Sequence, residues 1–415
     1  MTPSRIARRG AWLFPLWVAL LGADRIDLLG GRGPVVLTPF LVLLLPTLFV
    51  ESAARRVRQG RRWLDFPKSA TAQGALLLLL MALAAVSTIN SLDASITVQR
   101  TLLLVAQAGG ASWLIWTVAD DPLATRRLAQ GGVWGIGLAW AANLAQGLAF
   151  AGRLPYEIGV NGLRLLDLQP FNYAGLIPRL SGLSLDPNRA AYLAILHLAV
   201  VYAGRTTARR RWLAAGTIGL VGALSRSGLL AALVALGLAA FTRARAVPTR
   251  RHARDHARIV LALALMTAAV SAVLLWSPSL RGWTARTFAP AAERFSATEG
   301  SARLHADLLR RGTAEATRDV PRLLLGTGYG TSYLLLRDVF GTRYGNFHSL
   351  YLSMSVEAGL FALIVVVLLL LLPLPRAGRW LALLGATAVF NLFYQAGTEP
   401  ALWTALALAW QEGAV

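Results

Sequence analysis

Long apolar stretches, separated by short charged segments, run along the whole chain of 415 residues. Because a helix that crosses a bilayer needs about 20 apolar residues, this pattern predicts an all-α polytopic membrane protein with about 12 transmembrane helices. The first, seventh and last stretches are short or interrupted. The twelve stretches are residues 11–29, 34–50, 70–90, 99–119, 129–150, 188–204, 212–224, 227–242, 259–277, 349–372, 380–396 and 399–411.

Basic residues gather in alternate connections between these stretches. The first stretch follows a basic segment, as in a signal peptide, but no soluble domain comes after it, so we expect an uncleaved first span. If the N-terminus is cytoplasmic, all the short basic segments fall on one side, as the positive-inside rule requires. Both termini are therefore expected in the cytoplasm. The basic segments hold 23 of the 41 Lys and Arg and lie at 5–9, 55–68, 126–127, 205–211, 243–258 and 376–379. The whole cytoplasmic connections hold six acids: Glu51, Asp65, Asp120, Asp121, Asp255 and Glu412.

The composition excludes several classes of protein. With 56% hydrophobic and 15% charged residues, the chain has too little charge to cover a soluble protein of this length. The net charge of +21 is mostly explained by the topology, so nucleic acid is rejected as a partner. The chain has no cysteine, which excludes disulfide scaffolds, iron–sulfur centres and thiolate zinc sites. Among the five histidines only His252 and His256 are spaced as a pair, within a run of arginines, so we expect no metal or other cofactor.

Two long segments remain on the opposite, outer side. We expect residues 1–277 to form transmembrane helices 1–9 with an outer segment at 151–187, residues 278–348 to form a helical lid on the outer side, and residues 349–415 to form helices 10–12. Within the lid, 301–319 is predicted to be an amphipathic helix lying on the membrane or across the mouth of the bundle. Its apolar stripe is Leu304, Leu308 and Leu309.

Three polar patterns lie on that side. In the first, Asp186-Pro187-Asn188 begins a span between Arg179 and Arg189. Asp and Asn are typical helix caps, and an exposed helix N-terminus favours an anion. The structural alternative is a plain cap with arginines at the lipid headgroups.

The second pattern is Leu224-Ser-Arg226-Ser-Gly228, a tight turn between two apolar runs. An arginine at membrane depth is costly, which makes Arg226 a functional candidate. The alternative is an arginine whose side chain extends to the interface.

The third pattern begins with Gly326-Thr-Gly-Tyr-Gly330, which predicts a flexible turn rather than a phosphate loop because no Walker lysine follows. His348 comes next, at the point where the outer segment enters an apolar span. A half-buried histidine there suits a group that exchanges protons near neutral pH, although such a residue is often only a hydrogen-bonding group. Glu357 lies nine residues on, about 13.5 Å deeper and on the opposite side of the helix.

Together these patterns resemble the O-antigen ligase/polymerase superfamily of bacterial inner-membrane glycan transferases. The resemblance covers about 180–360 in the family's order, and the span layout covers the whole chain. One departure is that the family's usual His-Asn pair is His348-Ser349 here. Length and the single large late loop most resemble O-antigen ligase. The similar pieces are Gly182 to Asn188, Leu224 to Gly228, Ser301-Ala-Arg303-Leu304, and Gly328 to Leu360.

The resemblance implies a GT-C-like fold and the transfer of a glycan from undecaprenyl diphosphate to a sugar hydroxyl of lipid A–core. Transfer would occur at the periplasmic face of the inner membrane, with inversion and without a nucleotide sugar. A diphosphate leaving group needs positive charge. The sequence has no Asp-x-Asp pair but many periplasmic arginines, so we expect a metal-independent reaction. The expected catalytic residue is His348, which either removes the acceptor proton or orients the hydroxyl; the donor is held by Arg226, Arg303, Arg179 and Arg189, with Asp186, Asn188 and Tyr351 in support.

Three other functions compete. A polymerase of the same superfamily would use a second lipid-linked glycan as acceptor, and a protein O-oligosaccharyltransferase would use a Ser or Thr side chain. A lipid-linked glycan transporter or flippase would perform no chemistry. Transporters typically show internal repeats and polar residues at the midplane, whereas the polar residues here gather at one face.

Overall fold

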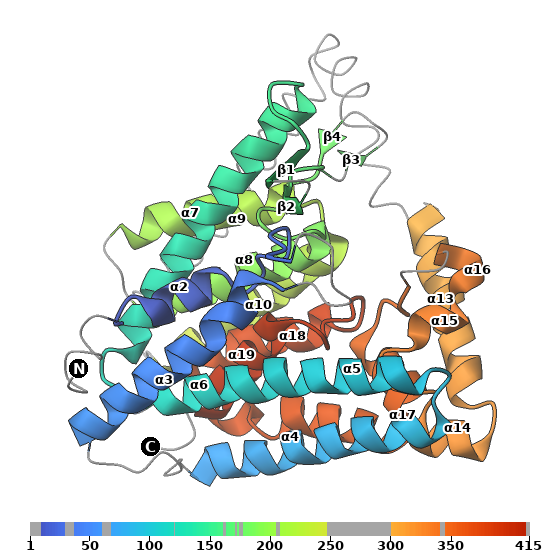
Figure 1. Ribbon diagram of the computed structural model, residues 1–415. Helices are drawn as coiled ribbons and strands as arrows, with labels where there is room; N and C mark the ends of the chain where they lie inside the picture. Colours follow the sequence, from blue (N-terminus) through green and yellow to red (C-terminus); the bar gives the residue numbers. More distant parts are fainter. Residues whose placement is uncertain are drawn as a thin grey trace.

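The computed structural model describes residues 10–29, 37–59, 68–119, 121–160, 163–170, 172–173, 177–204, 208–246, 300–340 and 345–411. These residues are mostly helical (Figure 1). Eleven of the twelve predicted apolar stretches contain a helix, and the other, 259–277, lies outside the described residues. The helices in these stretches are α2 (Leu13–Ala19), α3 (Pro39–Gln59), α4 (Lys68–Val86), α5 (Ala94–Leu104), α6 (Gly110–Val118), α7 (Ala124–Phe150), α8 (Pro187–Ala203), α9 (Arg209–Gly222), α10 (Arg226–Ala246), α17 (Leu350–Leu371), α18 (Leu381–Phe390) and α19 (Pro400–Gln411).

Four helical segments among the described residues are long and apolar enough to cross a membrane. They are Ala70–Asn90, Ala94–Val118, Ala124–Phe150 and Leu350–Arg376. The prediction of a helical integral membrane protein is therefore confirmed, while the count of twelve spans and the GT-C-like arrangement stay predictions.

The first predicted span, 11–29, is wrong as a single helix. Helix α2 has only seven residues, and the chain then turns and continues without helix through Asp24 and Arg25. The physical reason is that both charged side chains bind polar groups of the 181–185 segment, which a continuous helix would carry away from them.

The all-α prediction also needs a correction between residues 151 and 187. This segment contains two small antiparallel sheets, which Figure 1 shows near the end of α7. Strand β1 (Glu157–Val160) pairs with β2 (Leu163–Asp167), and β3 (Asn172–Tyr173) pairs with β4 (Ile177–Pro178). The sequence Asn161-Gly162 between β1 and β2 is the dipeptide preferred in two-residue hairpin loops, so the signal was present.

One end of the bundle is held together by Arg127 at the start of α7. Its guanidinium binds both oxygens of Glu51, near the end of α3, and donates to Ala11 O (3.1 Å) just before α2. It also pairs with Asp121 (3.5 Å), after α6. All of these chain ends belong to the side predicted to be cytoplasmic.

At the opposite end, the predicted lid contains four helices within the described residues: α13 (Gly300–Ala316), α14 (Val320–Leu325), α15 (Ser332–Leu335) and α16 (Arg337–Phe340). They lie together at one edge of the molecule, in orange in Figure 1. Helix α13 confirms the amphipathic helix, with Leu308 buried against α17, but Leu309 is 56% exposed and does not belong to the stripe. Residues 278–299 of the predicted lid lie outside the described residues.

The glycine run after α14 is fixed to α17 rather than free, contrary to the flexible turn predicted. Gly328 N donates to Glu357 O (3.0 Å), and Gly330 N and Ser332 N donate to the Glu357 carboxylate (3.0 and 3.2 Å). Helix α17 is kinked at Gly359 (φ 83°), where an added Cβ would lie 2.1 Å from Leu324 O. Glu357 therefore holds the loop and does not lie beside His348.

Candidate functional site

The Asp-Pro-Asn motif caps α8 as expected. The Asp186 side chain accepts from Asn188 N (2.7 Å), and Pro187 occupies the first turn. The Asn188 side chain in turn accepts from Arg179 Nη2 (3.3 Å). Arg179, which is 8% exposed, also donates from Nε to Ala223 O (3.0 Å), just after α9. Arg179 of the first polar pattern therefore contacts the residue that comes just before the Leu224–Gly228 turn of the second pattern.

The Leu-Ser-Arg-Ser-Gly turn presents Arg226 at the start of α10. Leu224 has a left-handed backbone (φ 49°), and Ser225 Oγ caps the helix by accepting from Gly228 N (3.1 Å). A Cβ on Gly228 would lie 2.5 Å from Ala191 Cβ, so the glycine lets α10 approach α8 closely. These contacts bring Arg226 next to the carbonyls that Arg179 binds, and to the N-terminus of α8.

Arg189 is engaged by two carboxylates. Its guanidinium makes ion pairs with Asp24 and Glu399, and it hydrogen-bonds Tyr394. The pairs join the chain after α2, the first turn of α8 and the residue before α19. Since two carboxylates already balance its charge, Arg189 contributes to holding these chain ends together at the base of the site.

His348 lies two residues before α17 and is half-buried. Its backbone is left-handed (φ 51°), and its N–H donates to Asn346 Oδ1 (2.8 Å). Its ring lies against His305 of α13, with ring centroids 4.6 Å apart, and against Phe340 of α16 at 6.0 Å. Burial lowers the pKa of His348 from its ordinary value of 6.5, which favours the neutral imidazole.

The start of α17 connects His348 to the arginine group. Leu350 N donates to Asn391 O (3.0 Å) and to Tyr394 O (3.1 Å), and the Tyr394 side chain reaches Arg189. The segment that carries His348 is therefore linked to Arg189 through Leu350 and Tyr394. Tyr351, which was expected to support the site, donates its hydroxyl to Ala388 O (2.9 Å) and joins α17 to α18.

The side chain of Arg303 lies outside the described residues, although its place in α13 is known. It comes two positions before His305, whose ring contacts His348. Among the described residues, no three His, Asp or Glu side chains gather as a metal site would require.

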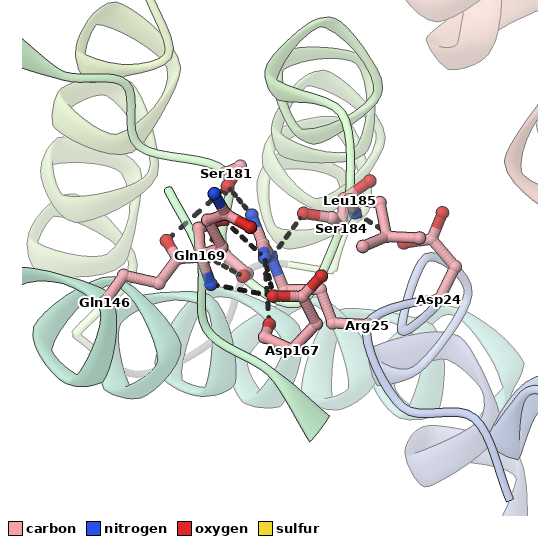
Figure 2. A network of polar contacts seen from close by, with 9 residues as sticks. Asp24, Arg25, Gln146, Asp167, Gln169, Ser181, Ser184 and Leu185 are labelled. Carbon is pink, nitrogen blue, oxygen red and sulfur yellow. Dashed lines mark hydrogen bonds and ion pairs between the residues drawn. The ribbon is translucent and has the colours of Figure 1, made fainter. Parts of the chain in front are cut away.

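Sequence reasoning missed two residues of this region. One is His305, which is 43 positions from His348 and shows no sequence pattern that pairs them. The other is Arg25, which is only 2% exposed. Figure 2 shows Arg25 surrounded by the segment that precedes the Asp-Pro-Asn motif: it donates to Ser184 O (2.7 Å), Ser181 Oγ (2.7 Å) and Asp167 O (2.8 Å). The sequence did contain a signal for Arg25, namely the charged pair Asp24-Arg25 inside the apolar stretch 11–29.

Comparison with known protein families gives a match over part of the chain. The model of the O-antigen ligase family matches residues 212–367, which include the Leu224–Gly228 turn, α13, His348 and most of α17. The search of curated proteins finds no match. The match covers 156 of the 415 residues, and over this part the chain is similar to the O-antigen ligase family.

Proposed function

We propose that the protein is an O-antigen ligase of the bacterial inner membrane that acts in lipopolysaccharide biosynthesis. It transfers a glycan from undecaprenyl diphosphate to a sugar hydroxyl of lipid A–core at the periplasmic face, with inversion. The observation that carries the proposal is the position of His348: it is half-buried at the same end of the bundle as Arg179 and Arg226, inside the family match.

In the proposed reaction, the acceptor oxygen attacks the anomeric carbon of the donor. The bond between that carbon and the diphosphate oxygen breaks, and its electron pair leaves with the diphosphate. The acceptor hydroxyl must lose its proton, and the neutral imidazole of His348 takes it or orients the hydroxyl for attack. The lowered pKa of His348 supports this role because it keeps the ring neutral at pH 7.

Arginines meet the charge of the departing diphosphate. Arg226 begins α10, where its guanidinium and the helix N-terminus both favour an anion. Arg303, a residue of α13, and Arg179, in the segment before α8, add further positive charge. Arg189 acts with them by keeping the N-terminus of α8 in place. Because arginines supply the charge, we propose a metal-independent reaction.

The domain arrangement follows from this chemistry. We propose that 278–348 forms a periplasmic lid over a cavity that opens sideways to lipid, since the donor's polyprenyl tail stays in the bilayer. Residues 1–277 and 349–415 supply the transmembrane helices, and both termini lie in the cytoplasm.

The decisive experiment is reconstitution in liposomes with undecaprenyl-diphosphate glycan and lipid A–core, in the presence of a chelator. Glycan attached to lipid A–core would establish a ligase. Longer lipid-linked glycans would instead identify a polymerase, and glycosylated Ser or Thr in an added periplasmic protein would identify a protein O-oligosaccharyltransferase. Movement of the donor between leaflets without any transfer would identify a flippase.

His348→Ala should abolish transfer, because in the proposed reaction the His348 imidazole takes the acceptor proton or orients the hydroxyl. The variant should still insert and give the thermal unfolding profile of the unsubstituted protein in detergent. Normal ligation by this variant would remove His348 from the reaction.

Arg226→Lys should reduce transfer by about 10- to 100-fold, since a single ammonium replaces a planar group that binds two phosphate oxygens. Donor affinity and rate should be measured together. As a control, Arg318→Lys changes an arginine on the exposed part of the lid, 61% exposed, and should leave both unchanged. Equal donor affinity and rate in Arg226→Lys and the unsubstituted protein would show that Arg226 serves only as an interfacial anchor.

A further inference from the structure

The packing of α13 on α17 brings a second histidine to the site. Leu308 of α13 is fully buried, and a Cβ on Gly312 would lie 2.6 Å from Leu352 Cδ2 and 2.8 Å from Phe347 Cδ1. Residues seven positions apart lie on the same face of a helix. The close approach at Gly312 therefore also directs position 305 toward the start of α17, where the His305 ring meets His348.

The imidazole of His348 contacts two neighbouring aromatic rings. A histidine that handles a proton is usually oriented by a hydrogen bond from its second ring nitrogen to a carboxylate or carbonyl. Within the part of the chain that the structure describes, neither ring nitrogen of His348 has such a partner; the ring instead contacts His305 at 4.6 Å (interplanar angle 31°) and Phe340 at 6.0 Å (42°). Offset ring contacts of this kind have a preferred geometry, so they can fix the direction in which the nitrogens point.

We infer that His305 is a positioning residue for the transfer reaction, holding the imidazole of His348 by ring-to-ring contact so that one nitrogen points toward the acceptor hydroxyl. This inference rests on the proposed function. It adds a role for α13: the helix that presents Arg303 to the donor also sets the orientation of the base, so donor binding and base orientation depend on one element.

The contact must be made by an uncharged ring. When His348 takes the acceptor proton it becomes a cation, and a second cation at 4.6 Å would oppose that step. Two of the arginines on α13 are paired with carboxylates: Arg311 pairs with Asp338 of α16 (2.6 Å), and Arg310 pairs with Asp307 (2.9 Å). A flat, uncharged side chain at position 305 is thus the requirement.

Three substitutions separate the ring contact from simple packing. His305→Ala and His305→Leu should lower kcat by about 10- to 100-fold through misalignment of the base, with KM for the lipid-linked donor changed less than about twofold. His305→Phe keeps a flat uncharged ring and should retain most of kcat. Leu309→Ala, on the exposed side of α13, is the matched control and should behave as the unsubstituted protein. Equal kcat in the Phe and Leu variants, or an unchanged kcat in the Ala variant, would overturn the inference.

A second measurement needs no substrate. Diethyl pyrocarbonate modifies neutral imidazoles, and mass spectrometry of the peptide that contains His348 reports its rate of modification. His305→Ala should raise this rate severalfold because a ring face becomes open, while His305→Phe should leave it low. An unchanged rate in His305→Ala would show that the rings do not shield each other and would overturn the inference. If the unsubstituted protein transfers glycan to no acceptor, the proposed function fails, and this labelling still decides whether the ring contact exists.

Discussion

His348 combines a left-handed backbone, a half-buried ring and a lowered pKa at one position. Non-glycine residues with φ near 51° are uncommon and gather at functional sites. The Asn346 side chain accepts the His348 N–H (2.8 Å) and thereby stabilises this conformation. The strained backbone turns the ring away from the helix it precedes and into contact with α13 and α16.

The direction of the pKa shift predicts how transfer depends on pH. Because burial disfavours the charged ring, His348 stays neutral below the ordinary histidine pKa of 6.5. The rate should therefore be constant near pH 7 and fall only when the pH drops through the lowered pKa, at a midpoint below 6.5. Initial transfer rates between pH 5 and 8 would check this, with donor binding measured at each pH as the control. An acid-side midpoint above 6.5 would contradict the role of burial.

At the residue scale, the sequence could single out His348, Arg226 and Arg179 as candidates because each stands out against an apolar background. It could not identify His305, because its role comes from a ring contact between segments 43 residues apart. Nor could it pair Arg189 with Asp24 and Glu399, which lie in separate parts of the chain. A charge can be recognised as unusual from the sequence, but its partner is fixed only by packing.

At the scale of elements, the contact between α8 and α10 places the two arginine patterns side by side. Gly228 is the position where α10 touches Ala191 of α8. Gly228→Ala should lower the free energy of unfolding by about 1–3 kcal/mol through overpacking, and should also lower transfer because Arg226 moves with the helix. Gly237→Ala is a matched control on the same helix, since nothing lies within 4 Å of its added Cβ.

Gly228→Ala and Gly237→Ala are compared by their thermal unfolding in detergent and by their donor binding. Gly237→Ala should be neutral or slightly stabilising, because alanine has the higher helix propensity. If both variants unfold at the same temperature, the glycine at 228 is not required for the approach of α10 to α8.

Hydropathy predicted where most helices lie but not how they end or bend. It could not reveal the break after α2, because Asp24 and Arg25 find their partners in a distant segment. It also could not reveal the kink at Gly359, which depends on the approach of Leu324 O from α14. The strands β1 and β2 were missed because four- and five-residue strands give little periodicity.

At the scale of the whole molecule, the two ends of the bundle are built from different structural elements. The end around Arg127 joins chain ends from the predicted cytoplasmic side, while the other end carries the strands and α13 to α16 (Figure 1). This separation supports the alternation of sides inferred from the charges.

The absence of cysteine allows the sidedness to be tested directly. Helix α7 has 27 residues and is about 40 Å long, enough to cross a hydrocarbon core of about 30 Å. Leu123 and Leu154, which are 51% and 37% exposed, lie just before and just after it. In cells with a permeable outer membrane, Leu154→Cys should react with a membrane-impermeant maleimide, whereas Leu123→Cys should react only after the inner membrane is opened.

The unsubstituted chain gives the background labelling. Labelling of both positions from the outside would show that α7 does not cross the membrane. Labelling of Leu123→Cys alone would invert the topology and place His348 and its arginines in the cytoplasm, where they could not meet a donor presented at the periplasmic face.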